Sequence, residues 1–253
     1  MKILVIGGTG RIGSSLADVL RGHGHEVTPA APSTGVDAVT GEGLDQAVAG
    51  MDVVVDVSNA PAWDDQAVLD FFTTSTTHQL AAEARAGVGK HVALTIVGAD
   101  NAPDSGYLRA KVAQEQLIAA SGRPYTVVRA TQFFEFVRAI ADAATDGDVV
   151  RLPAATLQPI AARDVVDLLA AAVVEPAVDG IVEIAGPEAI GLDELARRAL
   201  ASDGDPRTVV ADPSATYFGT PLDDGTLTPG AGARLAPTPF DDWLAEGAAA
   251  TTR

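Results

Sequence analysis

The sequence predicts an α/β fold in which helices cover both faces of a doubly wound parallel sheet. The run Ile3-Leu4-Val5-Ile6 is apolar at every position and mostly β-branched, as in a strand that is buried on both faces. Similar runs alternate with helical patterns as far as about Gly147. The chain has 253 residues, of which 47% are hydrophobic and 20% charged, which suits one large domain with a smaller C-terminal lobe.

A glycine-rich turn follows the first strand and leads into a helix over about residues 11–22. Glycines let a pyrophosphate approach the backbone and let the helix pack closely on the strand. The N-terminus of a helix also offers free N–H groups and a partial positive charge to phosphate. The turn therefore predicts a Rossmann-type dinucleotide site, to which we assign Gly7, Thr9, Gly10, Arg11, Ile12 and Gly13.

The end of the second predicted strand, over residues 25–31, bears on the choice of cofactor. An NAD site usually ends this strand with an acid that binds the adenosine 2′-hydroxyl. Here the strand ends in Ala30-Ala31-Pro32-Ser33-Thr34, without an acid, and Arg11, Ser33 and Thr34 are available for a 2′-phosphate. The sequence therefore favours NADP (NADPH) over NAD.

The next elements are a short strand over residues 35–39, a short helix over 42–49 and a buried strand over 52–57. Asn59 follows this last strand, and open α/β sheets bind ligands at the carboxyl ends of their strands. Asn59 is thus either a cofactor or active-site contact, or an ordinary turn residue. A long helix over about residues 64–86 begins with two acids, which suit a helix N-terminus.

A tyrosine and a lysine head the helix that follows the strand over residues 91–97. Tyr107 and Lys111 are four residues apart, so they share one face of this helix. An ammonium group beside the phenol favours phenolate, and lowering the tyrosine pKa from near 10 to about 7 needs roughly 4 kcal/mol. Such a phenol can act as a general acid. The alternative is a purely structural pair.

The strand over residues 125–131 leads into an aromatic segment, from which Gln132 and Phe133 are candidate substrate contacts. Beyond it we expect short strands at 149–152, 157–160 and 180–185, helices at 162–174 and 192–201, and an amphipathic C-terminal segment. We expect an NAD(P)-binding domain over residues 1–148 and a substrate-binding α+β lobe over 149–253, interwoven into one structural unit.

The glycine turn, Asn59, the Tyr107/Lys111 pair and the segment Arg129-Ala-Thr-Gln-Phe-Phe-Glu-Phe136 resemble the atypical short-chain dehydrogenases/reductases, in particular the NmrA-like NAD(P)-binding group. This resemblance implies that Tyr107 is the general acid/base and that Lys111 lowers its pKa and binds the nicotinamide ribose. The helper serine of the family falls on Ile96. Either Thr95 replaces it through a local twist, or no hydroxyl of this strand serves the reaction.

Composition excludes several other classes of function. The chain has no cysteine, and its four histidines lack metal-ligand spacing, so we expect no metal site. A formal net charge of −17 disfavours direct binding to nucleic acid or to an anionic membrane. No run approaches the length of a membrane span, so we expect a cytoplasmic protein whose partner is a small-molecule substrate. Family precedent adds a possible homodimer.

Together these features predict an NADPH-dependent oxidoreductase that reduces a small, largely apolar carbonyl, quinone or enone, with Tyr107 as proton donor. An alternative is a redox-sensing regulator, like the NmrA proteins, that binds NAD(P) without turnover. A third is an epimerase or dehydratase that uses bound cofactor transiently.

Overall fold

The computed structural model describes residues 1–251 and contains a seven-stranded sheet in the order β12-β9-β5-β4-β3-β1-β2. The pairs β1–β2, β1–β3, β3–β4 and β9–β12 are parallel. The predicted α/β class and doubly wound sheet are therefore confirmed. The strands are β1 (Lys2–Ile6), β2 (Glu26–Ala30), β3 (Val53–Asp56), β4 (Lys90–Ile96), β5 (Tyr125–Ala130), β9 (Gly180–Ala185) and β12 (Arg234–Leu235).

The chain divides into two compact units that interleave along the sequence. The first comprises residues 1–96, 106–129 and 166–182, and the second comprises residues 97–105, 130–165 and 183–253. The predicted assignment of cofactor binding to residues 1–148 and of substrate binding to residues 149–253 stays a prediction.

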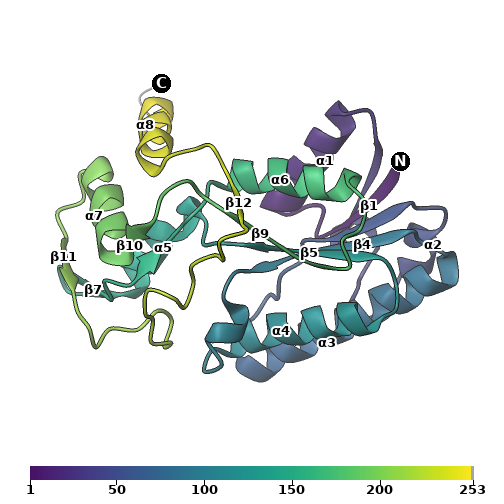
Figure 1. The fold of residues 1–253 in the computed structure, drawn as a ribbon, viewed down its shortest axis with the longest axis horizontal. Coiled ribbons are helices and arrows are strands. Elements are labelled where there is room, and N and C mark those ends of the chain that lie inside the picture. The colour runs from purple at the N-terminus through teal and green to yellow at the C-terminus, as the bar shows by residue number, and fades with distance from the viewer. Residues whose placement is uncertain (252–253) are drawn as a thin grey trace. The chain divides into compact units, whose positions relative to one another are not determined.

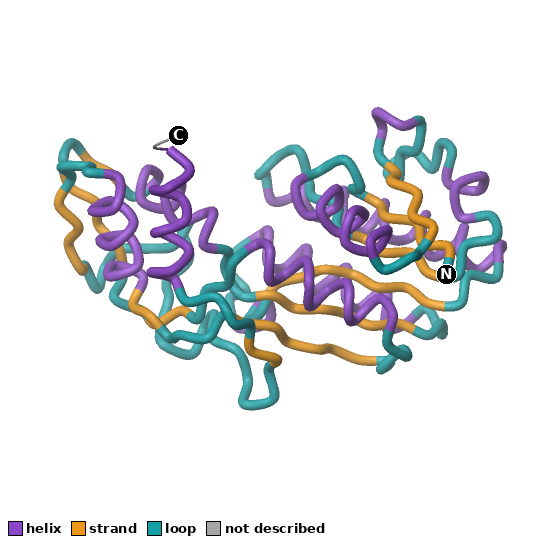
Figure 2. The backbone as a smooth tube through the Cα atoms, turned by 90° about the horizontal axis from the view of Figure 1, so that it is seen from above, coloured by secondary structure: helices purple, strands orange, loops and turns teal. Residues whose placement is uncertain are grey.

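In the first unit, helices cover both faces of the sheet. Helices α3 and α4 lie side by side on one face, and α1 and α6 lie on the other (Figure 1). The tube in Figure 2 shows the same alternation of strand and helix along the chain. The helices are α1 (Arg11–Gly22), α2 (Leu44–Val48), α3 (Asp65–Ala86), α4 (Gly106–Ala120) and α6 (Ala162–Val174), which begins in the second unit.

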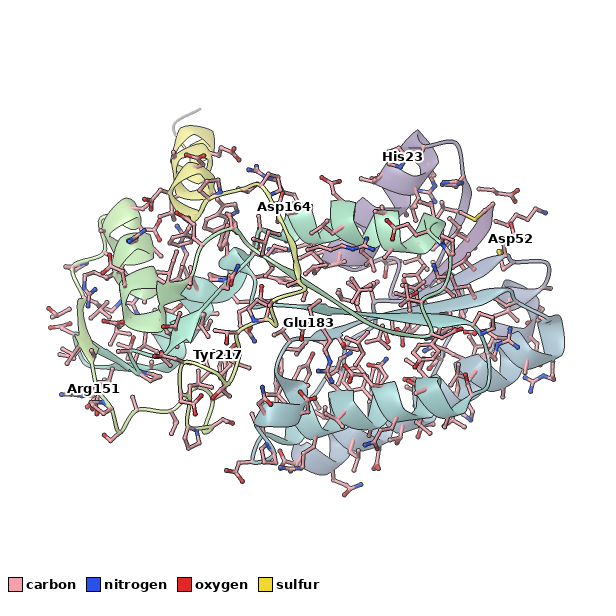
Figure 3. All side chains as sticks on the ribbon, in the orientation of Figure 1. His23, Asp52, Arg151, Asp164, Glu183 and Tyr217 are labelled. Carbon is pink, nitrogen blue, oxygen red and sulfur yellow. The ribbon has the colours of Figure 1, made fainter. Side chains whose placement is uncertain are left out.

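Strand register brings the loops after three strands to one edge of the sheet. Ile6 is paired with Ala30 on one side and with Asp56 on the other. Because these strands are parallel, the residues that follow them leave the sheet at the same edge. At the opposite edge, the Lys2 backbone N–H donates to Oδ2 of Asp52 at 2.7 Å (Figure 3 labels Asp52).

The short strand predicted over residues 35–39 is wrong, because this segment forms turns after the 3₁₀ helix η1 (Pro32–Thr34). Oδ1 of Asp37 accepts hydrogen bonds from the backbone N–H groups of Val39 and Thr40, at 2.8 and 3.2 Å. An Asp side chain that binds the backbone two residues ahead offers it an alternative to a strand ladder.

The second unit holds short strands and three helices. Strands β6 (Thr145–Asp146), β7 (Val149–Leu152) and β11 (Thr208–Ala211) form one sheet, and β8 (Thr156–Leu157) pairs with β10 (Ile190–Gly191). Its remaining elements are α5 (Val137–Ala143), α7 (Leu192–Asp203), α8 (Phe240–Thr251), η2 (Ala99–Asn101) and η3 (Phe134–Phe136).

Side-chain contacts hold the C-terminal helix within this second unit. The Phe240 ring lies 4.9 Å from that of Phe134 and stacks on that of Trp243 at 5.8 Å. The carboxylate of Asp164, which Figure 3 labels, accepts hydrogen bonds from the backbone N–H and the hydroxyl of Thr238, at 3.1 and 3.0 Å. Over residues 1–251, no helix is both long and apolar enough to cross a membrane.

Candidate functional site

The glycine turn between β1 and α1 leaves a concave backbone surface that side chains would fill. Gly7 has φ of +78°, and a Cβ there would lie 2.8 Å from the backbone N of Ser58. A Cβ on Gly13 would lie 2.3 Å from the carbonyl oxygen of Gly7. Real Cβ atoms do not approach backbone atoms so closely. The backbone geometry therefore requires glycine at both positions.

The N-terminus of α1 is open to an anion. Gly10 is the N-cap residue, no side chain caps this end, and the first turn contains no acid. The unpaired N–H groups and the positive end of the helix dipole therefore suit a phosphate. Thr9, Gly10 and Arg11 are exposed, Ile12 is half-buried and Gly13 is buried. The residues present thus fit the pyrophosphate of a dinucleotide.

A further glycine, Gly8, was missed by the sequence reasoning. Its Cβ would lie 2.6 Å from the carbonyl oxygen of Val5 and 2.7 Å from Cα of Pro29. The backbone N–H groups of Gly7 and Gly8 both donate to the carbonyl oxygen of Ala30, at 2.9 and 3.1 Å. The pair of adjacent glycines was the signal for this tight join between the turn and β2.

The loop after β2 carries the residues expected near the cofactor's 2′ position. Thr34 Oγ1 accepts from the Ala31 backbone N–H and donates to the Ala31 carbonyl oxygen, both at 2.9 Å, so its hydroxyl closes the loop. Ser33 and Arg11 are exposed. Thr34 is exposed as well, but its hydroxyl is engaged within the loop.

Tyr107 and Asn59 are brought together within the first unit, although they are 48 residues apart in the chain. The Tyr107 hydroxyl donates to Asn59 Oδ1 at 2.9 Å, and the backbone N–H of Ala60 donates to the same oxygen at 3.0 Å. The Tyr107 ring packs edge-on against the buried Phe72, with centroids 5.9 Å apart. On another side it contacts Trp63, at 5.5 Å, whose side chain is 75% exposed.

The acidity of Tyr107 differs from what the sequence predicts. Burial raises the pKa of its hydroxyl to about 12, and the hydrogen bond to Asn59 opposes this only in part. The predicted lowering toward neutrality is absent because no ammonium offsets the burial. Tyr107 is therefore a protonated phenol at neutral pH, which is a proton donor and a poor base.

Lys111 shares a neighbour with Tyr107, but its ammonium group is bonded elsewhere. Nζ lies 4.2 Å from the centre of the Phe72 ring and donates to the Leu94 carbonyl oxygen at 3.0 Å and to Gln114 Oε1 at 2.6 Å. Burial lowers the pKa of Lys111 to about 8, and the carboxylates of Asp56 and Glu115 oppose this change. The predicted role of Lys111 at a cofactor ribose stays a prediction.

A buried carboxylate, Asp56, links the loop that carries Asn59 to the helix that carries Lys111. Asp56 accepts from the Ser58 backbone N–H and hydroxyl, at 2.9 and 2.6 Å, and from the side-chain amides of Gln79 and Gln114, at 3.1 and 3.0 Å. Sequence reasoning missed this residue. An acid that ends an otherwise apolar strand was the available signal.

Thr95 is directed into the interior of the first unit. Thr95 is 3% exposed, and its Oγ1 donates to Glu115 Oε1 at 2.6 Å. Arg129 binds both oxygens of the same carboxylate, at 3.0 and 2.6 Å. Ile96, the next residue along β4, is half-buried. The Thr95 hydroxyl thus completes a buried ion pair.

The two residues predicted to contact substrate, Gln132 and Phe133, belong to the second unit. The Phe133 ring stacks on Phe136 at 5.7 Å, and Phe136 is 56% exposed. The Gln132 backbone carbonyl accepts from the Ile160 N–H at 2.9 Å. Its side-chain Oε1 is buried and has no hydrogen-bond partner among residues 1–251.

Neither a protein-family model nor a curated protein sequence matches the chain. Several solved structures are similar to it in fold. MoeE5 in complex with UDP-glucuronic acid and NAD has a TM-score of 0.78 at 19% identity, over 100% of this chain and 99% of that one. A short-chain dehydrogenase/reductase superfamily protein from Agrobacterium tumefaciens with bound NAD has a TM-score of 0.73 at 18% identity, over 100% and 97%.

A third similar structure is an NADPH-dependent quinone oxidoreductase from Escherichia coli, QOR2, with a TM-score of 0.69 at 18% identity over 96% of this chain and 98% of that one. At these identities the comparison concerns the fold. The resemblance is confirmed at that level: the chain has the Rossmann-type fold of these NAD(P)-binding structures.

Proposed function

We propose that this protein is an NAD(P)H-dependent reductase in which Tyr107 donates the proton. The observation that carries the proposal is the pairing of Tyr107 with Asn59 at 2.9 Å, in the same unit as a glycine turn that fits a dinucleotide. Asn59 follows β3 and the turn follows β1, two neighbouring strands whose carboxyl ends share one edge of the sheet. Open α/β sheets bind their ligands at such an edge.

Different residues bind the cofactor and transfer the proton. Gly7, Gly10 and Gly13 admit the pyrophosphate to the backbone, and the N-terminus of α1 stabilises its charge. When bound, the reduced nicotinamide supplies hydride to an electrophilic carbon of the substrate. The Tyr107 phenol, which its raised pKa keeps protonated, gives its proton to the substrate oxygen as the carbonyl π bond breaks. Solvent then restores the proton to Tyr107.

The surroundings of Tyr107 support a small, largely apolar carbonyl, quinone or enone as substrate. The exposed Trp63 indole contacts the Tyr107 ring and offers an apolar, planar surface beside it. Gln132 and Phe133, which belong to the second unit, stay predicted substrate contacts. The similarity in fold to a quinone oxidoreductase agrees with this substrate class. We assign NADPH as the preferred cofactor, because Arg11 and Ser33 are exposed and no acid ends β2.

The test is titration of the purified protein with NADPH and NADH, followed by nicotinamide fluorescence, and then turnover with quinones, ketones and enones. Tight NADPH binding and turnover that falls about 10²-fold or more in Tyr107→Phe would support the reductase. Tyr125→Phe is the matched control, since it removes a phenol from a different element. Equal turnover by wild type and Tyr107→Phe would refute the role of Tyr107.

A redox-sensing protein that binds NAD(P) without turnover is the second candidate. Two observations favour it: Thr95 is engaged by Glu115, and Lys111 is engaged by Leu94 and Gln114. Tight binding with no turnover of any acceptor would select this candidate. Transient cofactor reduction during conversion of a substrate without net oxidation would instead select an epimerase or dehydratase.

A further inference from the structure

The structure leaves the reaction without the hydroxyl that accompanies the tyrosine in the proposed family. The candidate for that role was Thr95, whose hydroxyl donates at 2.6 Å to Glu115 inside the first unit. Glu115 also binds Arg129 through both carboxylate oxygens. Turning the Thr95 hydroxyl toward a substrate would take a donor from a buried carboxylate, which is costly. A different polar group must serve Tyr107.

We propose that Asn59 is this group: its Oδ1 holds the Tyr107 hydroxyl in place, and its amide N–H binds the substrate oxygen that receives the proton. Asn59 is thereby a catalytic residue and not a cofactor ligand. The inference rests on the proposed reductase function, and it names the residue that takes the place of the family's serine.

The orientation of the Asn59 carboxamide follows from its two donors. The Ala60 backbone N–H and the Tyr107 hydroxyl both need an acceptor, and both lie at hydrogen-bond distance from the same atom, 3.0 and 2.9 Å away. That atom is therefore the oxygen, and the amide nitrogen occupies the other branch of the side chain. Within residues 1–251 no hydrogen bond is found for this nitrogen, so its two N–H groups remain for a ligand.

Hydrogen bonds to the buried Asp56 hold the loop that carries Asn59. Ser58, the preceding residue, donates through its backbone N–H and its hydroxyl to the buried Asp56 carboxylate. Asp56 in turn accepts from amides on α3 and α4, through Gln79 and Gln114. A donor that acts on a developing charge needs such preorganisation, because it must not reorient during the reaction.

The proton-transfer step balances with these groups. As hydride reaches the carbonyl carbon, a C–H bond forms and the C=O π electrons move to oxygen. The Tyr107 hydroxyl, which donates to Asn59 Oδ1 in the free protein, turns its proton to the substrate oxygen. The Asn59 N–H stabilises the negative charge there while the Tyr107 O–H bond breaks and the new O–H bond forms. Asn59 is exposed, so solvent reaches the phenolate at this edge and returns a proton to it. The product is an alcohol and the oxidised cofactor.

The test compares Asn59→Ala and Asn59→Asp with Asn101→Ala, which removes the other asparagine of the chain. Asn101 is an exposed residue whose amide binds the backbone carbonyls of Gly225 and Thr226 in the second unit. We expect kcat to fall about 10²- to 10³-fold in both Asn59 variants, as for loss of one oxyanion donor, and the NADPH Kd to stay within about 2-fold. Asn101→Ala should retain wild-type kcat.

Asn59→Asp separates the two halves of the role. A carboxylate still accepts from Tyr107 and from the Ala60 N–H but offers no N–H to the substrate. In cofactor-free protein labelled with ¹³C at the tyrosine ζ-carbon, we expect Asn59→Ala to shift the Tyr107 resonance, which Tyr107→Phe assigns. Asn59→Asp should leave that hydroxyl hydrogen-bonded while kcat is lost.

Three results would overturn the proposal. The first is a weaker NADPH Kd in Asn59→Ala with kcat retained, which would make Asn59 a cofactor contact. The second is a kcat loss in Thr95→Val equal to that in Asn59→Ala. The third is an unchanged Tyr107 resonance in Asn59→Ala. If wild-type protein turns over no acceptor, the proposed reductase itself fails, and the resonance alone then decides whether Asn59 holds Tyr107.

Discussion

The buried ammonium group of Lys111 predicts an unusual dependence of stability on pH. Lys111 is 3% exposed, and burial lowers its pKa from the ordinary 10.5 to about 8. In the unfolded chain the same side chain has its ordinary pKa. The unfolded chain therefore binds a proton between about pH 8 and pH 10.5 that the folded protein does not.

The sign and size follow from linkage. Stability rises with pH wherever the unfolded state binds more protons, so the Lys111 contribution is fully present above about pH 10.5 and is lost as the pH falls through 8. The gap between the two pKa values corresponds to about 3 kcal/mol in total. Between about pH 7.5 and pH 9.5, the part expected is about 2 kcal/mol.

The measurement is urea unfolding of cofactor-free wild type and Lys111→Met at these two pH values. We expect the free energy of unfolding of wild type, relative to the variant, to rise by about 2 kcal/mol over the interval. The titration of Tyr107, whose pKa burial raises to about 12, lies above this window. Lys90 is present in both proteins, so its contribution cancels.

Lys2→Met is the matched control, because it replaces an exposed lysine in the same unit. Its free energy of unfolding should follow that of wild type across the interval. If the free energies of unfolding of wild type and Lys111→Met also change in parallel with pH, the pKa of Lys111 is not lowered by folding. The assignment of Lys111 to the buried cluster with Gln114 would then be wrong.

Three further changes have defined outcomes. Gly13→Ala places a methyl group 2.3 Å from the Gly7 carbonyl oxygen. We expect the free energy of unfolding to fall by about 1–3 kcal/mol in thermal unfolding and cofactor binding to weaken in a fluorescence titration. Unchanged binding would contradict the fit of the turn to the cofactor. Glu115→Gln leaves the buried Arg129 without its carboxylate and should cost about 3–5 kcal/mol in urea unfolding, whereas a loss under about 1 kcal/mol would refute a buried pair. Asp64→Ala removes the N-cap of α3, which accepts from two backbone N–H groups, and should cost about 1 kcal/mol by the same assay; no change would show that the cap is replaced by water.

Local patterns predicted the parts of this fold that local physics determines. The apolar run of β1, the glycine turn and the helical spacing in α1 each depend on neighbouring residues, and all three are present in the structure. The error at residues 35–39 has a local cause as well, since the Asp37 side chain competes for the backbone. The signal in the sequence was Asp37 itself, because an Asp side chain often binds the backbone N–H two residues ahead, here that of Val39.

The side-chain pairings of the candidate site could be predicted only in part. Helical spacing placed Tyr107 and Lys111 on one face, and both do contact Phe72. Which atom each polar head binds depends on residues far away in the chain, such as Asn59 for Tyr107 and Leu94 for Lys111. Periodicity carries no information about such partners, and so it also gave the wrong direction for the Tyr107 pKa.

The separation of the two polar heads explains how one helix can serve both stability and chemistry. Lys111 lies one turn after Tyr107, but its ammonium donates to Gln114, and the Gln114 amide donates to Asp56. Asp56 holds the loop whose Asn59 accepts from Tyr107. The lysine therefore reaches the phenol through a chain of hydrogen bonds instead of through its charge. On this argument, neutralising Lys111 should alter the position of Asn59 more than the acidity of Tyr107, whose pKa is raised by burial without an opposing contribution from Lys111.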